Sequence, residues 1–136
     1  RLHVIQPPAT SQKHEALAIH GDELRNMTQR LLPVAVSGDP IQYQINRNQE
    51  GWVVELINND GVFKTGDQPA RIHSEATAKV VLKPNPSSAL TGKPREWVTD
   101  TTLTRNAEGL ILVAIPPGES RFVFLPTARV GAKQAP

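Results

Sequence analysis

After Pro33, apolar and polar residues alternate with a period of two over several short runs, and this alternation predicts half-buried β-strands. The predicted strands are 41–46, 52–57, 62–64, 76–83, 96–104, 110–115 and 122–125. The side chains expected to face inward are Ile41, Tyr43, Ile45, Trp52, Val54, Leu56, Ala78, Val80, Leu82, Phe122 and Phe124. Because residues 110–115 are apolar on both faces, we expect them to form a central strand.

Turn-forming residues separate these strands at intervals of about ten residues, the spacing of antiparallel sandwiches and barrels. The turns and loops are expected at 47–51, 58–61, 64–74, 84–94, 106–109 and 116–119. Asp60 and Gly61 suit a tight hairpin turn, because Asp-Gly tolerates a positive φ. No helical pattern lies between the strands, so parallel crossovers are excluded. The sequence predicts an all-β fold, an antiparallel β-sandwich of about six to seven strands.

The residues before Pro33 follow a different pattern. Leu24, Met27 and Leu31 recur at helical spacing, and Asp22 can cap the first turn. We therefore predict a helix over 22–31, ended by the proline.

The change of pattern predicts three parts of the chain. Residues 1–32 form an N-terminal segment, with a short strand at 2–5, that belongs with the end of a preceding catalytic domain. Residues 33–126 form the sandwich, and residues 127–136 are expected to be a flexible tail. Because the chain begins at Arg1 rather than Met, we expect a processed product or a fragment of a longer protein.

Composition and charge exclude several classes of function. The chain has 136 residues, no cysteine and a formal net charge of +2. Without cysteine there is neither a disulfide nor a thiolate metal site. The basic residues are scattered, whereas a nucleic-acid footprint is clustered, so no nucleic-acid partner is expected. No apolar stretch approaches the length of a membrane span, so no membrane partner is expected either.

Two segments resemble a known class of domain. They are 51–64, GWVVELINNDGVFK, and 113–124, VAIPPGESRFVF. Together they resemble the C-terminal β-sandwich domains that follow the catalytic barrel in multidomain bacterial glycoside hydrolases. In those domains a strand reads Trp-x-Val-x-Leu-x-Asn, and the last hairpin carries Pro-Pro-Gly. The resemblance covers about residues 31–126.

The resemblance implies a noncatalytic accessory domain of a carbohydrate-active enzyme. Such a domain packs on the catalytic domain of the same or an associated polypeptide, and a secreted or periplasmic location is favoured. The catalytic carboxylates of that family lie in the barrel, so none is carried over to this chain, and no cofactor is expected.

The residues themselves offer little chemistry. Glycoside hydrolysis needs two carboxyl groups about 5–5.5 Å or 6.5–9.5 Å apart, by mechanism. Glu55 and Asp100 lie in predicted strands, where we expect them to face solvent or pair with a cross-strand base. The histidines, none spaced as ligands on one helix face, are His3, His14, His20 and His73. Oxygens that could hold calcium belong to Asn58, Asn59, Asp60 and Asp67. Turn chemistry explains 58–61 without a metal, and none is expected.

Exposed aromatic residues decide between the remaining functions, because sugar-binding modules stack pyranose rings on exposed Trp or Tyr. Trp97, which follows a polar loop, and Phe63, beside a turn, are the candidate carbohydrate-binding residues. A core position is nevertheless favoured for Trp97, and Trp52 is expected to be buried. The alternatives to an accessory domain are a carbohydrate-binding module, possessing such exposed rings, and an adhesion or assembly module, marked by an apolar patch or an open sheet edge. A small independent hydrolase is a third alternative.

Overall fold

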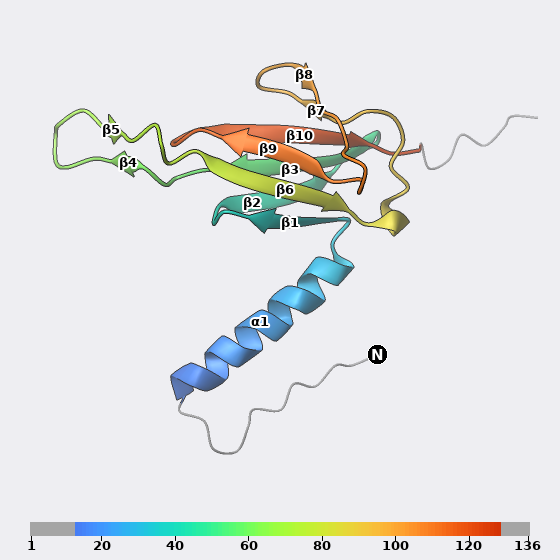
Figure 1. The fold of residues 1–136 in the computed structure, drawn as a ribbon, viewed down its shortest axis with the longest axis horizontal. Coiled ribbons are helices and arrows are strands. Elements are labelled where there is room, and N and C mark those ends of the chain that lie inside the picture. Colours follow the sequence, from blue (N-terminus) through green and yellow to red (C-terminus); the bar gives the residue numbers. More distant parts are fainter. Residues whose placement is uncertain (1–12, 129–136) are drawn as a thin grey trace, which may run out of the picture. The chain divides into compact units, whose positions relative to one another are not determined.

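The computed structural model describes residues 13–128, and the chain divides into two units at the boundary between Leu32 and Pro33. The described part of the first unit is one helix, α1 (Lys13–Leu31). The second unit consists of antiparallel strands and one 3₁₀ turn, η1 (Pro86–Ser88). Its strands are β1 (Val34–Gly38), β2 (Gln42–Arg47), β3 (Gly51–Ile57), β4 (Val62–Phe63), β5 (Arg71–Ile72), β6 (Ala78–Pro84), β7 (Arg95–Glu96), β8 (Thr101–Thr102), β9 (Ile111–Ile115) and β10 (Ser120–Pro126). The expected all-β antiparallel sandwich is confirmed (Figure 1).

The helix α1 starts at Lys13, well before the start that the apolar spacing predicted. Asp22 therefore lies inside the helix and is not its N-cap, contrary to the sequence-based prediction. Residues 13–18 are mostly strong helix formers, and this propensity extends the helix where apolar periodicity gives no signal. The helix ends at Leu31 as expected, because Pro33 cannot continue the hydrogen-bond ladder. Among the described residues, no helix has the length and apolar content needed to cross a membrane.

Two sheets of the second unit pack face to face around one core (Figure 1). One sheet has the strand order β1-β6-β9, and the other has the order β2-β3-β10-β7-β8. Because successive side chains point to opposite faces of a sheet, every second residue of the long strands lies between the sheets. The buried core consists of Val34, Val36, Val54, Leu56, Val80, Leu82, Ile111, Val113, Ile115, Val123 and Leu125. The inward face expected for β6 is thus confirmed.

The inner face of β10 differs from the prediction. Val123 and Leu125 are fully buried and pair with Val54 and Trp52 of β3. Phe122 and Phe124 therefore point to the outer face of the five-stranded sheet, contrary to expectation. The segment is apolar at every position, so a period of two cannot decide which set of residues faces the core.

Edge positions account for two further corrections. β9 was expected to be central, but it lies at the edge of the three-stranded sheet, and Leu112 is 66% exposed. β2 is likewise an edge strand, so Tyr43 is 41% exposed although it alternates correctly with its neighbours. Ile41 and Ile45 pack against the core as expected, and Trp52 is half-buried against it.

Two predicted strands are shorter than expected. In place of the predicted strand 96–104 the chain forms two two-residue strands, β7, which begins one residue earlier at Arg95, and β8. They pair with each other through a turn at 97–100. The predicted strand at 62–64 does not fold back on β3. It pairs instead with β5, which lies inside the expected loop 64–74, so the turn at 58–61 leads out of the sandwich rather than closing a hairpin.

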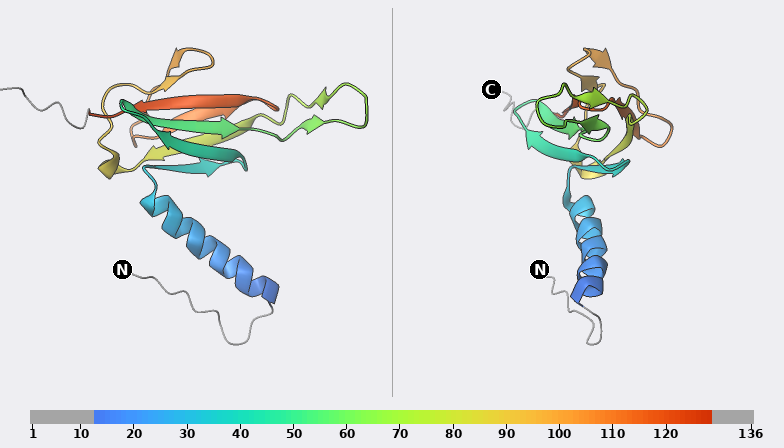
Figure 2. Two further views of the ribbon diagram at one scale, coloured as in Figure 1. Left: turned by 180° about the vertical axis from the view of Figure 1, so that it is seen from behind. Right: turned by 90° about the vertical axis from the view of Figure 1, so that its left-hand side faces the viewer.

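The paired strands β4 and β5 form a hairpin that projects from one end of the sandwich; residues 61–75 are called the arm below (Figures 1 and 2). The C-terminal boundary lies slightly later than predicted. Thr127, placed in the expected tail, is buried, and its N–H donates to the Glu50 carbonyl oxygen at 2.9 Å. Residues 129–136, the predicted strand at 2–5 and His3 lie outside the described residues.

Candidate functional site

The two faces of the arm carry different pairs of side chains. Its strands pair Val62 with Ile72 and Phe63 with Arg71, so each pair shares one face of the hairpin. Three of these side chains are large, apolar and exposed: Val62 by 36%, Phe63 by 55% and Ile72 by 62%. The arm therefore exposes apolar side chains on both of its faces.

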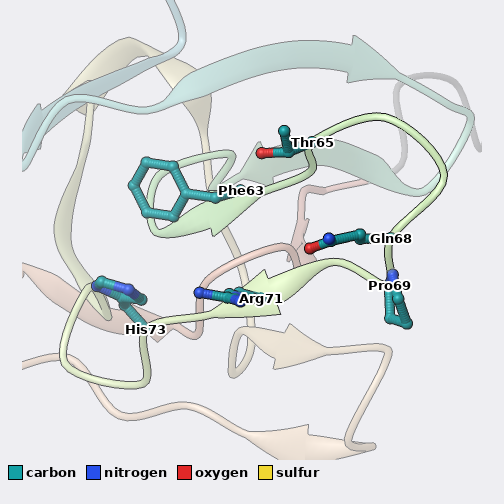
Figure 3. Close-up of a pocket in the computed structure, with 6 residues that line it drawn as sticks. All are labelled: Phe63, Thr65, Gln68, Pro69, Arg71 and His73. Atoms are coloured by element: carbon teal, nitrogen blue, oxygen red, sulfur yellow. The ribbon is translucent and has the colours of Figure 1, made fainter.

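One face of the arm holds a shallow pocket of about 420 Å³ (Figure 3). The residues that line it are Phe63, Thr65, Gln68, Pro69, Arg71 and His73. The rings of Phe63 and His73 lie 5.1 Å apart in a tilted arrangement, with the Arg71 side chain near them. This pocket combines one apolar ring with a guanidinium, an imidazole and an amide, and it contains no carboxylate among its lining residues.

Buried Asn58 anchors the base of the arm. Its side-chain amide donates to the carbonyl oxygens of Ala76 at 2.8 Å and Ile115 at 2.9 Å, and its Oδ1 accepts from the Asp60 N–H at 3.0 Å. The side chain thus joins β3 to the ends of the other sheet and to both ends of the arm. A calcium-binding role was considered for Asn58, and these bonds explain its position instead.

Gly61 fixes the direction in which the chain leaves the sandwich. Its φ is +71°, and a Cβ added there would lie 2.4 Å from the Cβ of Ala76. The neighbouring Val62 side chain lies against Gly118, because a Cβ on that glycine would meet it at 2.9 Å. The base of the arm is therefore tightly packed, while its outer part is exposed.

The second candidate residue, Trp97, lies on the turn between β7 and β8. It is 46% exposed, so the core position favoured for it is wrong. Its indole stacks on the Phe124 ring with centroids 5.3 Å apart and an interplanar angle of 23°. Its backbone N–H donates to the Phe122 carbonyl oxygen at 2.9 Å. The residue is thus held at the surface by both its backbone and its ring.

The Glu96 carboxylate organises the same turn. Glu96 is 3% exposed and accepts from the Val98 N–H at 2.9 Å, the Thr99 N–H at 2.8 Å, the Thr99 hydroxyl at 2.6 Å and the Phe122 N–H at 3.3 Å. Burial alone raises the pKa of this carboxyl group, but the hydrogen bonds lower it more, so the pKa lies below its ordinary value. The group is therefore a structural anion, and the sequence analysis did not single it out.

Arg95 and Asp100 form an ion pair across the same turn. Asp100 lies in the turn with a φ of +52°, not in a strand as predicted. Glu55 lies on β3, and β10 separates that strand from β7. The structure thus places one of the two acids considered for catalysis on β3 and the other in the β7–β8 turn, where Asp100 is already paired.

The other titratable residues considered are dispersed. His73 lies on the arm, and Asp60 lines a second pocket with Asp39 and Glu75. The carboxylate of Asp39 accepts from the Lys79 N–H at 2.7 Å. Within the part of the chain that the structure describes, no three His, Asp or Glu side chains gather as a metal site would require.

The two candidate sugar-binding residues are not brought together. Phe63 lies on the arm at one end of the sandwich, and Trp97 lies on the β7–β8 hairpin (Figure 1). They define two separate surfaces. Comparison of the chain with protein-family models, with curated proteins and with solved structures finds no match.

Proposed function

We propose that the chain is a noncatalytic accessory domain of a larger carbohydrate-active enzyme, a glycoside hydrolase, and that it packs on and supports the catalytic domain. The observation that carries this proposal is the arm, a two-stranded hairpin whose ladder exposes the apolar side chains of Val62, Phe63 and Ile72. The resemblance of segments 51–64 and 113–124 to accessory sandwich domains names the kind of partner.

The exposed arm is unfavourable in free energy, because its apolar side chains contact water and its strand ladder is short. A two-stranded hairpin is at best marginally stable by itself. The outer part of the arm has only a two-residue ladder, Val62 with Ile72 and Phe63 with Arg71. Phe63 and Ile72 lie on opposite faces of the hairpin, so a partner that encloses the arm would cover both. Covering them would remove apolar area from water and add the stabilisation that this ladder lacks.

The base of the arm is also held in a fixed position, which favours docking. Asn58 and Gly61 fix its base to the sandwich, so its direction is set before any partner binds. A pre-organised element loses less conformational entropy on binding than a free loop does. The mixture of apolar side chains with Arg71 and His73 matches the aromatic and Arg enrichment of protein interfaces.

Hydrogen exchange in the natural polypeptide that carries this sequence tests the proposal. The backbone amides of residues 61–75 should exchange more slowly in that polypeptide, or with the associated catalytic domain bound, than in the 136-residue chain alone. Equal exchange of the arm in both samples would contradict the proposal.

A matched pair of variants separates docking from general surface effects. Replacing Phe63 and Ile72 together with Ser should lower the melting temperature of the catalytic domain while changing that of the isolated chain little. Leu112→Ser is the control, because Leu112 is 66% exposed against 62% for Ile72 and lies on β9, outside the arm. If Leu112→Ser lowered the melting temperature of the catalytic domain as much as the double variant does, the arm would not be the docking element.

A further inference from the structure

The outer face of the five-stranded sheet is a surface separate from the arm. The strand registers define one row across it, from Asn46 through Val53 and Phe124 to Arg95 and Thr102. These side chains share the face opposite the core, because Val54 and Val123, adjacent to them in sequence, point inward. Neighbouring strands are about 4.8 Å apart, so the row from β2 to β10 spans about 10 Å.

A second row runs parallel to the first. It joins Gln44 of β2, Glu55 of β3 and Phe122 of β10. The two rows together place the half-buried rings of Phe122 and Phe124 on the same face as the exposed amides of Gln44 and Asn46, two strands away. We call the rings of β10 the aromatic half of the face and the amides of β2 its polar half, and Val53 and Glu55 of β3 lie between them.

Trp97 covers the aromatic half and is the most exposed ring on this face. One side of its indole rests on Phe124, and its 46% exposure leaves the other side open to solvent. Its backbone bond to Phe122 and the Glu96 carboxylate hold the turn in one conformation. Ligand binding therefore needs little ordering of the ring, which favours affinity.

The polar half offers both hydrogen-bond donors and acceptors, and a hydroxyl group can use both. Each side-chain amide carries two donor hydrogens and an oxygen with two lone pairs. Gln44 donates one hydrogen to Asn46 at 3.2 Å, which orients both amides and uses only part of their capacity. A ring that stacks on an apolar surface and carries hydroxyl groups at its edge, as a pyranose does, matches this division of the face.

The charges on this face disfavour anionic ligands. The rows and the Trp97 turn contain the carboxylates of Glu55 and Asp100 and one guanidinium, that of Arg95, which Asp100 already pairs. An anionic sugar or a nucleic-acid backbone would meet a surface with more acids than bases. We propose that the outer face of the β2-β3-β10-β7-β8 sheet, centred on Trp97 stacked on Phe124, binds a neutral polysaccharide.

Affinity electrophoresis of the isolated chain through gels containing a panel of neutral polysaccharides tests this site. The wild type should be retarded by at least one polysaccharide, and Trp97→Ala should lose at least tenfold in affinity without a change in fold. Trp97→Tyr, which keeps a stacking ring, should retain most of the binding. Phe63→Ala is the matched control, because Phe63 is also an exposed ring, 55% against 46% for Trp97, but lies on the arm, and this variant should bind the polysaccharide as the wild type does.

Tryptophan fluorescence gives a second measurement that does not depend on gel mobility. The chain has two tryptophans, so in Trp97→Phe only Trp52 reports. A soluble oligosaccharide of the retained polysaccharide should change the emission of the wild type and leave that of Trp97→Phe unchanged. The site is overturned by an absence of retention across the panel, by retention that survives Trp97→Ala, or by retention lost only in Phe63→Ala. None of these results bears on docking of the arm, which is measured by hydrogen exchange.

Discussion

Replacement of the buried Glu96 by Gln probes the anion that organises the β7–β8 turn. Oε1 accepts from the N–H groups of Val98 and Phe122, and Oε2 accepts from the N–H and the hydroxyl of Thr99. Gln keeps one oxygen and puts an NH₂ group in place of the other. In either orientation of the amide, an NH₂ group would therefore face groups that now donate to the carboxylate.

The structure sets the size of the effect. Hydrogen bonds to charged groups contribute about 1.5–3 kcal/mol each, and Glu96→Gln loses two of them. The turn lies at the surface and can open to water, which lowers the cost of this loss. We therefore expect a loss of about 2 kcal/mol out of the roughly 5–15 kcal/mol that stabilise a domain. For a domain of this size the melting temperature at pH 7 should fall by roughly 8–16 °C.

The pH dependence of the difference follows from the pKa of Glu96. This pKa is lowered in the folded state, so the carboxylate stabilises the fold above the unfolded pKa of about 4.3. The stabilisation is lost as the pH falls through the lower folded value. The gap in melting temperature between the wild type and Glu96→Gln should therefore narrow below about pH 4.

Differential scanning calorimetry between pH 7 and pH 3 measures both effects. Glu108→Gln is the control, because it removes the same charge from an exposed position on another turn, and it should melt within about 2 °C of the wild type. If Glu96→Gln melted within about 3 °C of the wild type at pH 7, or if the gap stayed constant on acidification, the account of Glu96 as a structural anion would fail.

Three further predictions concern the fold. Asn58→Ala leaves the buried Ile115 carbonyl oxygen and the partly buried Ala76 carbonyl oxygen without their donor and should cost about 2–4 kcal/mol in chemical denaturation, and an unchanged midpoint would refute its role as an anchor. Trp52→Ala removes a half-buried ring that packs on the core beneath the Arg47 guanidinium, 4.6 Å from the ring centroid. It should lower the unfolding free energy by about 2–4 kcal/mol, whereas an effect below about 1 kcal/mol would show that the ring is peripheral. A chain lacking residues 1–32 should still melt cooperatively, because the unit boundary lies at Leu32 and Pro33, and loss of a cooperative transition would show that those residues complete the sandwich.

Local alternation was sufficient to predict the fold class and most of the inner faces. It worked for β3 and β6, where Val54, Leu56, Val80 and Leu82 alternate with neighbours that are less buried. It failed for β10, because Phe122 to Leu125 are all apolar and only the pairing with β3 selects the inner set.

Edges and hairpin partners could not be predicted, because they depend on sheet order. The apolar run of β9 resembles a central strand, yet β9 lies at the edge of the smaller sheet. In the same way, Asp60 and Gly61 predicted a turn, but not that the following strand would pair with β5 to form the arm.

The candidate sites were predicted only in part. Trp97 and Phe63 were found from their positions beside polar turns, and both are exposed. Their surroundings depend on distant segments: Trp97 rests on Phe124, and Asn58 bonds to Ile115. Glu96 was missed, although it has a local signal: Thr99 follows it three residues later and bonds back to its carboxylate.

Reducing-sugar release by the isolated 136-residue chain tests most directly the claim that this domain does no chemistry of its own. The account predicts no release above the buffer blank from any member of a broad polysaccharide panel, including any that the chain binds. Turnover by the wild type that is abolished by Glu55→Gln or by Asp100→Asn, with the melting temperature unchanged, would contradict it.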